Sequence, residues 1–225
     1  MYPLIPAELT QNALQLLVYF VTILGAVFGL ALSIGSVVLI SKLPQTPTDL
    51  VTGIVLFGFS FLLVVWIWTG YTTTMTDLPS EVRGSFVLNI MLLFCVAVEP
   101  YLFYVLVEGQ STLLEFASSV YALEIGAMLF ILAGLMRILL GEVKRRGSHD
   151  LPPARLRRFR LTMLTQATAA VVFTVSALPS FWIPVPFGQY LRFDAWYFVI
   201  GVLLVAPRVG GRAPSGVVSG GEAKC

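Results

Sequence analysis

Charged residues, histidine and cysteine are scarce in this chain of 225 residues. Asp, Glu, Lys and Arg make up 12% of it, whereas soluble domains carry about 25%. So few charges cannot cover a water-soluble surface when 57% of the residues are hydrophobic and the mean hydropathy is +0.89. The class of soluble globular domains is therefore excluded, and the lipid bilayer is the expected solvent and partner.

Side chains arranged for chemistry are also missing. The one histidine, His149, lies in a polar stretch without a second ligand, there is no glycine loop of the phosphate-binding type, and no nucleophile has a base nearby. We therefore expect no enzyme, no metal site and no cofactor. Cys95 lies inside an apolar stretch and Cys225 ends the chain, so no disulfide is expected either.

Apolar stretches of membrane-spanning length recur along the chain. The hydrocarbon layer is about 30 Å thick and takes about 20 apolar residues per helix, and clusters of proline and glycine separate the stretches. Residues 208–225 are rich in glycine and predict a flexible cytoplasmic tail. The sequence thus predicts one all-α, polytopic membrane domain over residues 1–207, with six transmembrane helices at residues 12–41, 49–75, 84–107, 112–141, 160–179 and 192–206.

Basic residues are concentrated between the fourth and fifth predicted helices. Short loops rich in Lys and Arg stay in the cytoplasm, so this connection and both chain termini are expected on that side. Lys42 and Arg192 are then the loop cations outside. Beside a membrane, such a basic segment contacts anionic lipid head groups, and no nucleic-acid partner is expected. The basic residues of the connection are Lys144, Arg145, Arg146, Arg155, Arg157, Arg158 and Arg160.

The first predicted helix carries small residues at every fourth position: Gly25, Gly29 and Ser33. Residues four apart lie on one helix face, and small residues let a second backbone approach closely within lipid. Two interpretations follow. The face packs against other helices of the same chain, or it meets its own copies around a shared axis and forms a homo-oligomer.

Three polar residues, Asn89, Glu99 and Glu124, interrupt the predicted spans. At 1.5 Å per residue from the loop that joins their helices, Glu99 lies about 13 Å deep and Glu124 about 20 Å deep. A buried carboxyl group without a partner takes up a proton instead of staying charged. The two carboxyl groups therefore form either a cation or proton site, or structural hydrogen bonds to Asn89, to Ser or Thr hydroxyls, or to Trp and Tyr. Pro100 follows Glu99 and predicts a kink there.

Three segments match those of a known family in residues, order and spacing. They are Phe59–Trp68, then Leu88–Asn89 with Leu92–Phe94 and Pro100–Tyr101, and finally Tyr121–Leu123. Together they resemble the transmembrane protein 175 family of lysosomal and prokaryotic potassium channels, over about residues 50–140. The resemblance implies a six-helix unit with cytoplasmic termini, which agrees with the topology predicted from charge. It also implies a homotetramer whose first helices line a potassium pore that apolar side chains constrict.

The first helix departs from the pattern of that family. The family carries Arg, three further residues and then Phe-Ser-Asp, whereas the best alignment puts Leu16 and Phe20–Thr22 at those places. The chain thus resembles a divergent single-repeat member that lacks this motif. If its first helix lines a pore, the resemblance implies that Val27, Ala31 and Ile34 face inward.

Three functions follow from these features. A homotetrameric potassium channel with a pore along the first helix agrees with the resemblance and with the small-residue face. A non-conducting scaffold or accessory subunit keeps the fold without the first-helix motif. Proton-coupled transport uses Glu99 and Glu124. In a prokaryote, each of these would be a multi-pass protein of the cell membrane.

Overall fold

Helices make up nearly all of what the computed structural model describes, namely residue 22, residues 25–34, residue 37 and residues 46–77, 83–108, 111–146, 153–185 and 190–209. In these ranges the only β contact is an isolated bridge between Pro184 and Tyr190. The predicted all-α fold is therefore confirmed for the described residues. The elements are a helical segment at Gly25–Ile34, then α2 (Pro47–Asp77), α3 (Arg83–Glu108), α4 (Ser111–Arg146), α5 (Pro153–Ser176), the short 3₁₀ helix η2 (Pro179–Phe181) and α6 (Leu191–Val209).

Three of these helices, α2, α3 and α4, are long and apolar enough to cross a membrane. By the same measure α5 and α6 are not among them, and α5 opens with four arginines, so that its apolar part is Leu161–Ser176. Most of the first predicted span, residues 12–41, lies outside the described residues, as does nearly all of the predicted tail, residues 208–225. Length and composition thus support a membrane protein with at least these three candidate spans.

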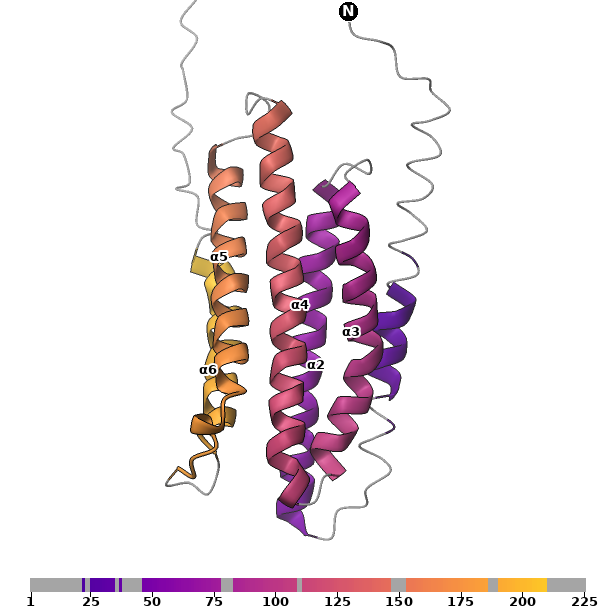
Figure 1. Ribbon diagram of the computed structural model, residues 1–225, viewed down its shortest axis with the longest axis vertical. Helices are drawn as coiled ribbons and strands as arrows, with labels where there is room; N and C mark the ends of the chain where they lie inside the picture. Colours follow the sequence, from indigo (N-terminus) through magenta and orange to yellow (C-terminus); the bar gives the residue numbers. More distant parts are fainter. Residues whose placement is uncertain are drawn as a thin grey trace, which may run out of the picture.

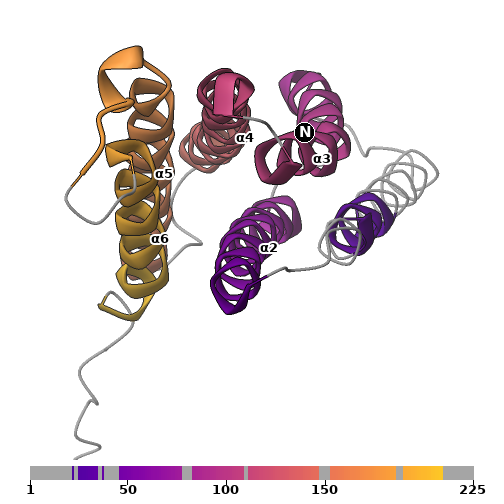
Figure 2. The ribbon, with the colours of Figure 1, turned by 90° about the horizontal axis from the view of Figure 1, so that it is seen from below.

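The long helices lie side by side along one axis (Figure 1). Viewed along that axis, α4 lies between α3 and the α5–α6 pair, and α2 closes the group on a second side (Figure 2). The Gly25–Ile34 segment lies at the outer side of α2, where the ring of Phe28 is 5.0 Å from that of Trp68. Each of the four helices α2 to α5 therefore turns one side toward a common interior.

One end of the bundle, at the top of Figure 1, collects most of the basic residues, and we call it the basic end. It contains the last residues of α2 and α4 and the first residues of α3 and α5. The predicted basic loop is largely helical, because α4 continues to Arg146 and α5 already begins at Pro153. Proline suits the first helical position, since its φ is preset and it lacks only an N–H that has no helical partner there. Basic residues in the last turn of α4 complement the negative end of the helix dipole.

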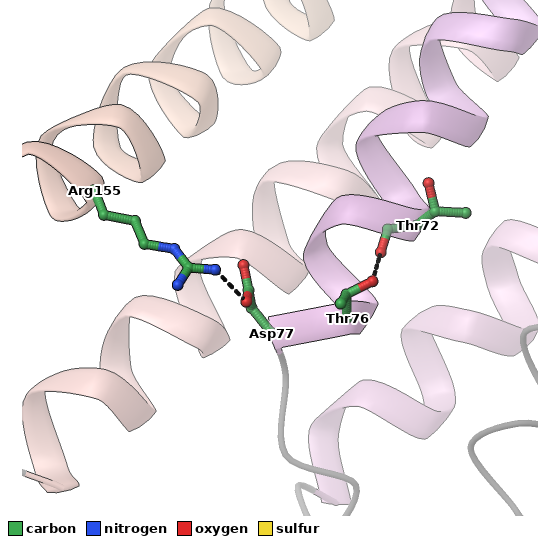
Figure 3. Close-up of polar contacts among 4 residues, drawn as sticks. All are labelled: Thr72, Thr76, Asp77 and Arg155. Carbon is green, nitrogen blue, oxygen red and sulfur yellow. Dashed lines mark hydrogen bonds and ion pairs between the residues drawn. The ribbon is translucent and has the colours of Figure 1, made fainter. Parts of the chain in front are cut away.

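An ion pair joins α2 and α5 at the basic end. Arg155 Nη2 lies 2.7 Å from Asp77 Oδ1, and both side chains are partly exposed (Figure 3). The threonines before Asp77 bond within their own helix, as when the Thr76 hydroxyl donates to the carbonyl oxygen of Thr72 at 2.8 Å (Figure 3). The threonine hydroxyl groups at this end of α2 thus bond within α2 itself. Asp77 is the residue that joins α2 to α5.

Close packing of α4 on α5 depends on Gly126. A Cβ atom at this position would lie 2.6 Å from Thr174 Oγ1 and 3.3 Å from the carbonyl oxygen of Ala170. We expect Gly126→Ala to lower the free energy of unfolding by about 1–3 kcal/mol, because the two backbones must move apart. Gly201→Ala in α6 is the matched control, since nothing lies within 4 Å of its Cβ position. It should be neutral or stabilise by up to about 1 kcal/mol. Thermal unfolding in detergent compares the two variants, and equal losses would contradict this role of Gly126.

Candidate functional site

Glu99 lies between α2, α3 and α4, and the carboxyl oxygens of Glu124 in α4 are buried as well. Glu99 is 2% exposed and lies in α3, which runs as one helix through Pro100. Its Oε1 accepts a hydrogen bond from Ser60 Oγ at 2.5 Å and a longer one from the Tyr121 hydroxyl at 3.4 Å. At 1.5 Å per residue, the three bonded residues lie about 13 to 20 Å from the nearer end of their helices. Three helices therefore meet at one carboxyl group near the middle of their length.

Glu124, about one turn after Tyr121 in α4, lacks such partners. Both of its carboxyl oxygens are buried and accept no hydrogen bond from any described residue. Glu99 and Cys95 of α3 are the titratable groups in its electrostatic surroundings. A carboxyl group that is buried without a hydrogen bond is costly in an apolar interior. Such an orphaned group is typical of a site that takes up a proton, a water molecule or a cation.

The two carboxyl groups thus differ in a way that the sequence did not indicate. The predicted structural role fits Glu99, whose partners are a serine and a tyrosine hydroxyl. The unpaired oxygens of Glu124 fit the predicted ion or proton site. Ser60 was not singled out from the sequence, although a lone serine between Phe59 and Phe61 in an apolar span is a usable signal.

A second set of buried polar groups lies nearer the basic end. Tyr71 and Gln166 are 0% exposed, and neither the Tyr71 hydroxyl nor the Gln166 amide atoms bond to a described residue. The Gln166 amide nitrogen lies over Gly70, 3.1 Å from the position of a Cβ atom. Asn89 is also here and not at the carboxyl pair, with Nδ2 3.9 Å from Met75 Sδ and Oδ1 unpaired. Buried amide and hydroxyl groups without protein partners are places where ordered water binds.

Aromatic rings close the carboxyl site on the side of α6. The indole of Trp196 is buried, with ring-centroid distances of 5.6 Å to Tyr121, 5.8 Å to Phe59 and 5.7 Å to Phe173. Its Nε1 donates to Ser176 Oγ at 2.8 Å, so the one polar atom of the indole is satisfied. This packing holds the Tyr121 ring in place and keeps water away from that side of the site.

A buried cation closes the opposite end of the bundle. Arg192, the second residue of α6, is 0% exposed, and its guanidinium also lies 5.3 Å from the ring centre of Trp182. The assignment of Arg192 as a loop cation from the sequence is therefore wrong, because the side chain caps the carboxyl end of α5, where the helix dipole is negative. Its five acceptors are the carbonyl oxygens of Ser176, Ala177, Leu178 and Glu115, at 2.7 to 3.2 Å, and the hydroxyl of Ser118.

The three residues that the resemblance places along a pore lie in different environments. Ala31 is 4% exposed and Val27 is half-buried, both against the core of the chain itself, whereas Ile34 is 42% exposed. Within one chain, the side chain of Ala31 thus faces other helices of the same chain, and Ile34 faces outward.

The small residues of the same segment also differ in their surroundings. A Cβ atom on Gly25 would lie 3.1 Å from the indole of Trp68, so this glycine permits close packing on α2. No atom lies within 4 Å of the Cβ position of Gly29, and Ser33 is exposed with its hydroxyl bonded to the Gly29 carbonyl oxygen at 2.8 Å. Described residues of the chain therefore cover Gly25 and leave Gly29 and Ser33, which lie further along the same helix, uncovered.

Comparison of the chain with protein-family models, curated proteins and solved structures found no match. The resemblance to the transmembrane protein 175 family therefore remains a prediction that depends on the sequence segments alone. In the described residues, fold and site define a class: an all-α protein with three helices able to span a membrane and two carboxyl groups in its interior.

Proposed function

We propose that this chain is a six-span integral membrane protein with cytoplasmic termini, and that it exchanges protons for a monovalent cation at Glu99 and Glu124. Potassium is the cation that the sequence resemblance favours. The observation that carries the proposal is the pair of buried, unpaired carboxyl oxygens of Glu124 beside the hydrogen-bonded Glu99. A purely structural carboxyl group is expected to have partners for its oxygens.

The two carboxyl groups have different tasks in this proposal. Ser60 and Tyr121 donate to Glu99 and hold it as a fixed acceptor. Two carboxylates in an interior of low dielectric constant repel each other, and one proton or one cation beside them relieves this repulsion. Glu124 has no competing hydrogen bond, so it releases its proton when a cation arrives and takes one up when the cation leaves. The charge at the site is thereby conserved.

The unpaired groups of Tyr71, Asn89 and Gln166 provide sites for water between the carboxyl pair and the basic end. A proton that enters from the cytoplasm needs such groups, since apolar side chains cannot carry it. These three residues are therefore assigned to the cytoplasmic approach to Glu99 and Glu124.

A flux assay in liposomes tests the proposal. Purified full-length protein is reconstituted into vesicles that contain potassium chloride and a pH-sensitive dye, and the vesicles are diluted into potassium-free buffer. Potassium–proton exchange acidifies the interior without any added ionophore. We expect Glu124→Gln and Glu99→Gln to slow acidification at least about ten-fold, since an amide keeps the shape of the side chain but cannot carry the proton at position 124 and removes the carboxylate charge that attracts the cation at position 99. Asp194→Asn, at an exposed acidic position of α6, is the matched control and should keep the wild-type rate.

A protonophore separates this function from the second candidate, a homo-oligomeric potassium channel along the first helix. The open side at Gly29 and Ser33 supports that candidate, because small residues permit contact with another copy. A channel acidifies the vesicles only when a protonophore is added, and both glutamine variants then act as wild type. That result would replace exchange by conduction. No flux in either condition with folded protein would reject both and favour a scaffold or accessory subunit.

A further inference from the structure

One side of α5 is left uncovered by the described residues along nearly the whole helix. Exposed positions recur there at alternating spacings of three and four residues, which keeps them on one face. They are Leu161, Leu164, Thr168, Val171 and Val175. The other side of the helix packs into the bundle and buries Phe159, Gln166, Ala169, Ala170, Phe173 and Ser176. The uncovered face is mainly aliphatic, as lipid-facing surfaces are.

Two arginines continue this face toward the basic end. Arg157 precedes Leu161 by four residues and Arg160 precedes Leu164 by four, and both are exposed. In the described part of the chain neither of them has an acidic partner, whereas Arg155, on another side of the helix, is paired with Asp77. The guanidinium groups of Arg157 and Arg160 are therefore available to an outside anion.

Helix stability does not account for arginines at these positions. They are three residues apart on one face of α5, and like charges at this spacing repel each other. An external anion between them removes this penalty.

The length of the apolar part places this anion at the membrane surface. Residues Leu161 to Ser176 rise about 24 Å at 1.5 Å per residue, somewhat less than the hydrocarbon layer of about 30 Å. A span this short holds its flanking arginines near the head groups, with their alkyl parts along the acyl chains. Guanidinium groups bind phosphate oxygens through two parallel hydrogen bonds.

We infer that Arg157 and Arg160, together with the aliphatic face at Leu161 and Leu164, form a binding site for one anionic phospholipid at the basic end of α5. The head-group phosphate lies between the two guanidinium groups, and the acyl chains run along the uncovered face. This inference depends on membrane insertion of α5, as proposed above, and not on Glu99 or Glu124. A failure of proton exchange therefore leaves it standing.

Lipid selectivity of the full-length protein tests the site. The protein is reconstituted into phosphatidylcholine nanodiscs that contain a trace of spin-labelled phosphatidylglycerol or spin-labelled phosphatidylcholine. Electron paramagnetic resonance then gives the fraction of each label that the protein immobilises. We expect wild type to prefer phosphatidylglycerol. Arg157→Gln and Arg160→Gln should each lower this preference roughly five-fold, the effect of one basic residue at a membrane surface.

Arg158→Gln is the matched control, because Arg158 is exposed at the same end of α5 but lies about 100° around the helix from Arg157. It should leave the preference unchanged, and an equal loss in all three variants would overturn the site in favour of diffuse attraction by the basic end. Arg157→Lys replaces the glutamine variants if these fail to fold. It keeps the charge but loses the paired hydrogen-bond donors, so we expect a partial loss of the preference for phosphatidylglycerol. In wild type, a preference that does not fall with added salt would also overturn the site.

Discussion

Arg192→Leu is expected to lower the free energy of unfolding by about 3–5 kcal/mol, because a hydrogen bond to a charged group contributes about 1.5–3 kcal/mol and a buried acceptor left without a donor costs about 1–3 kcal/mol. That is a large share of the stability of a domain, which is about 5–15 kcal/mol. The guanidinium is fully buried, and it donates to the carbonyl oxygen of Ser176, the last residue of α5, and to those of the next two residues. Leucine fills part of the space but leaves the carbonyl oxygens of Ser176 and Ala177 without this donor, whereas that of Leu178 keeps a hydrogen bond from the N–H of Phe181. It also releases Ser118 and the Glu115 carbonyl oxygen, so α4, α5 and α6 lose their common contact.

Two further variants make this expectation specific. Arg192→Lys keeps a positive charge at the end of α5 but cannot reach all five acceptors, so an intermediate loss is expected. Arg145→Leu is the control, because Arg145 is 75% exposed and has one ion pair with Glu142 within its own helix. It should change stability by less than about 1 kcal/mol. Unfolding by a denaturing detergent, followed by circular dichroism, compares the three variants. Equal effects of Arg192→Leu and Arg145→Leu would contradict the capping role.

Apolar length predicted the helices of the bundle but not their ends. The stretch at residues 112–141 belongs to α4, yet α4 continues to Arg146, and the stretch at residues 160–179 belongs to an α5 that begins at Pro153. The physical reason is that the length of an apolar stretch reflects the thickness of the hydrocarbon layer. Backbone hydrogen bonds can continue the helix beyond that layer. Local capping is a better guide to the ends. At the start of α2, the N–H of Thr46 donates to Asp49 Oδ2 at 3.0 Å and the N–H of Asp49 donates to Thr46 Oγ1 at 3.1 Å, a reciprocal pattern that the sequence already carries.

The contacts of the carboxyl pair needed the tertiary structure. Counting along two helices from a shared loop gave Glu99 and Glu124 depths that differ by about one helical turn, and Tyr121, about one turn before Glu124, is the residue of α4 that bonds to Glu99. No count of this kind could show that α2 turns Ser60 toward Glu99, since the rotation of a helix about its own axis depends on all of its neighbours. The burial of Arg192 likewise depends on the turn between α5 and α6, which brings a residue that follows a proline-rich stretch back onto Ser176.

The two buried carboxyl groups should respond in opposite directions when each is replaced by leucine. Glu124→Leu removes a group whose oxygens have no partner and ends its repulsion with Glu99. We expect it to raise the free energy of unfolding by about 1–3 kcal/mol, the cost of an unsatisfied buried polar group. Glu99→Leu leaves the hydroxyl groups of Ser60 and Tyr121 without their acceptor, so it should lower the free energy of unfolding by a similar amount. Unfolding in the same detergent measures both, and Glu99→Leu with Ser60→Ala should recover part of the loss.

The combination of stability and transport then decides what Glu124 is for. If it exchanges protons as proposed, Glu124→Leu gives a protein that is more stable and inactive, which is the usual sign of a residue kept for function at the expense of stability. If Glu124→Leu destabilises the protein as much as Glu99→Leu does, Glu124 has partners in the membrane and both carboxyl groups are structural. A gain in stability with transport unchanged would instead locate the exchange step at Glu99 alone. Glu124 would then neither carry the proton nor stabilise the packing of the helices.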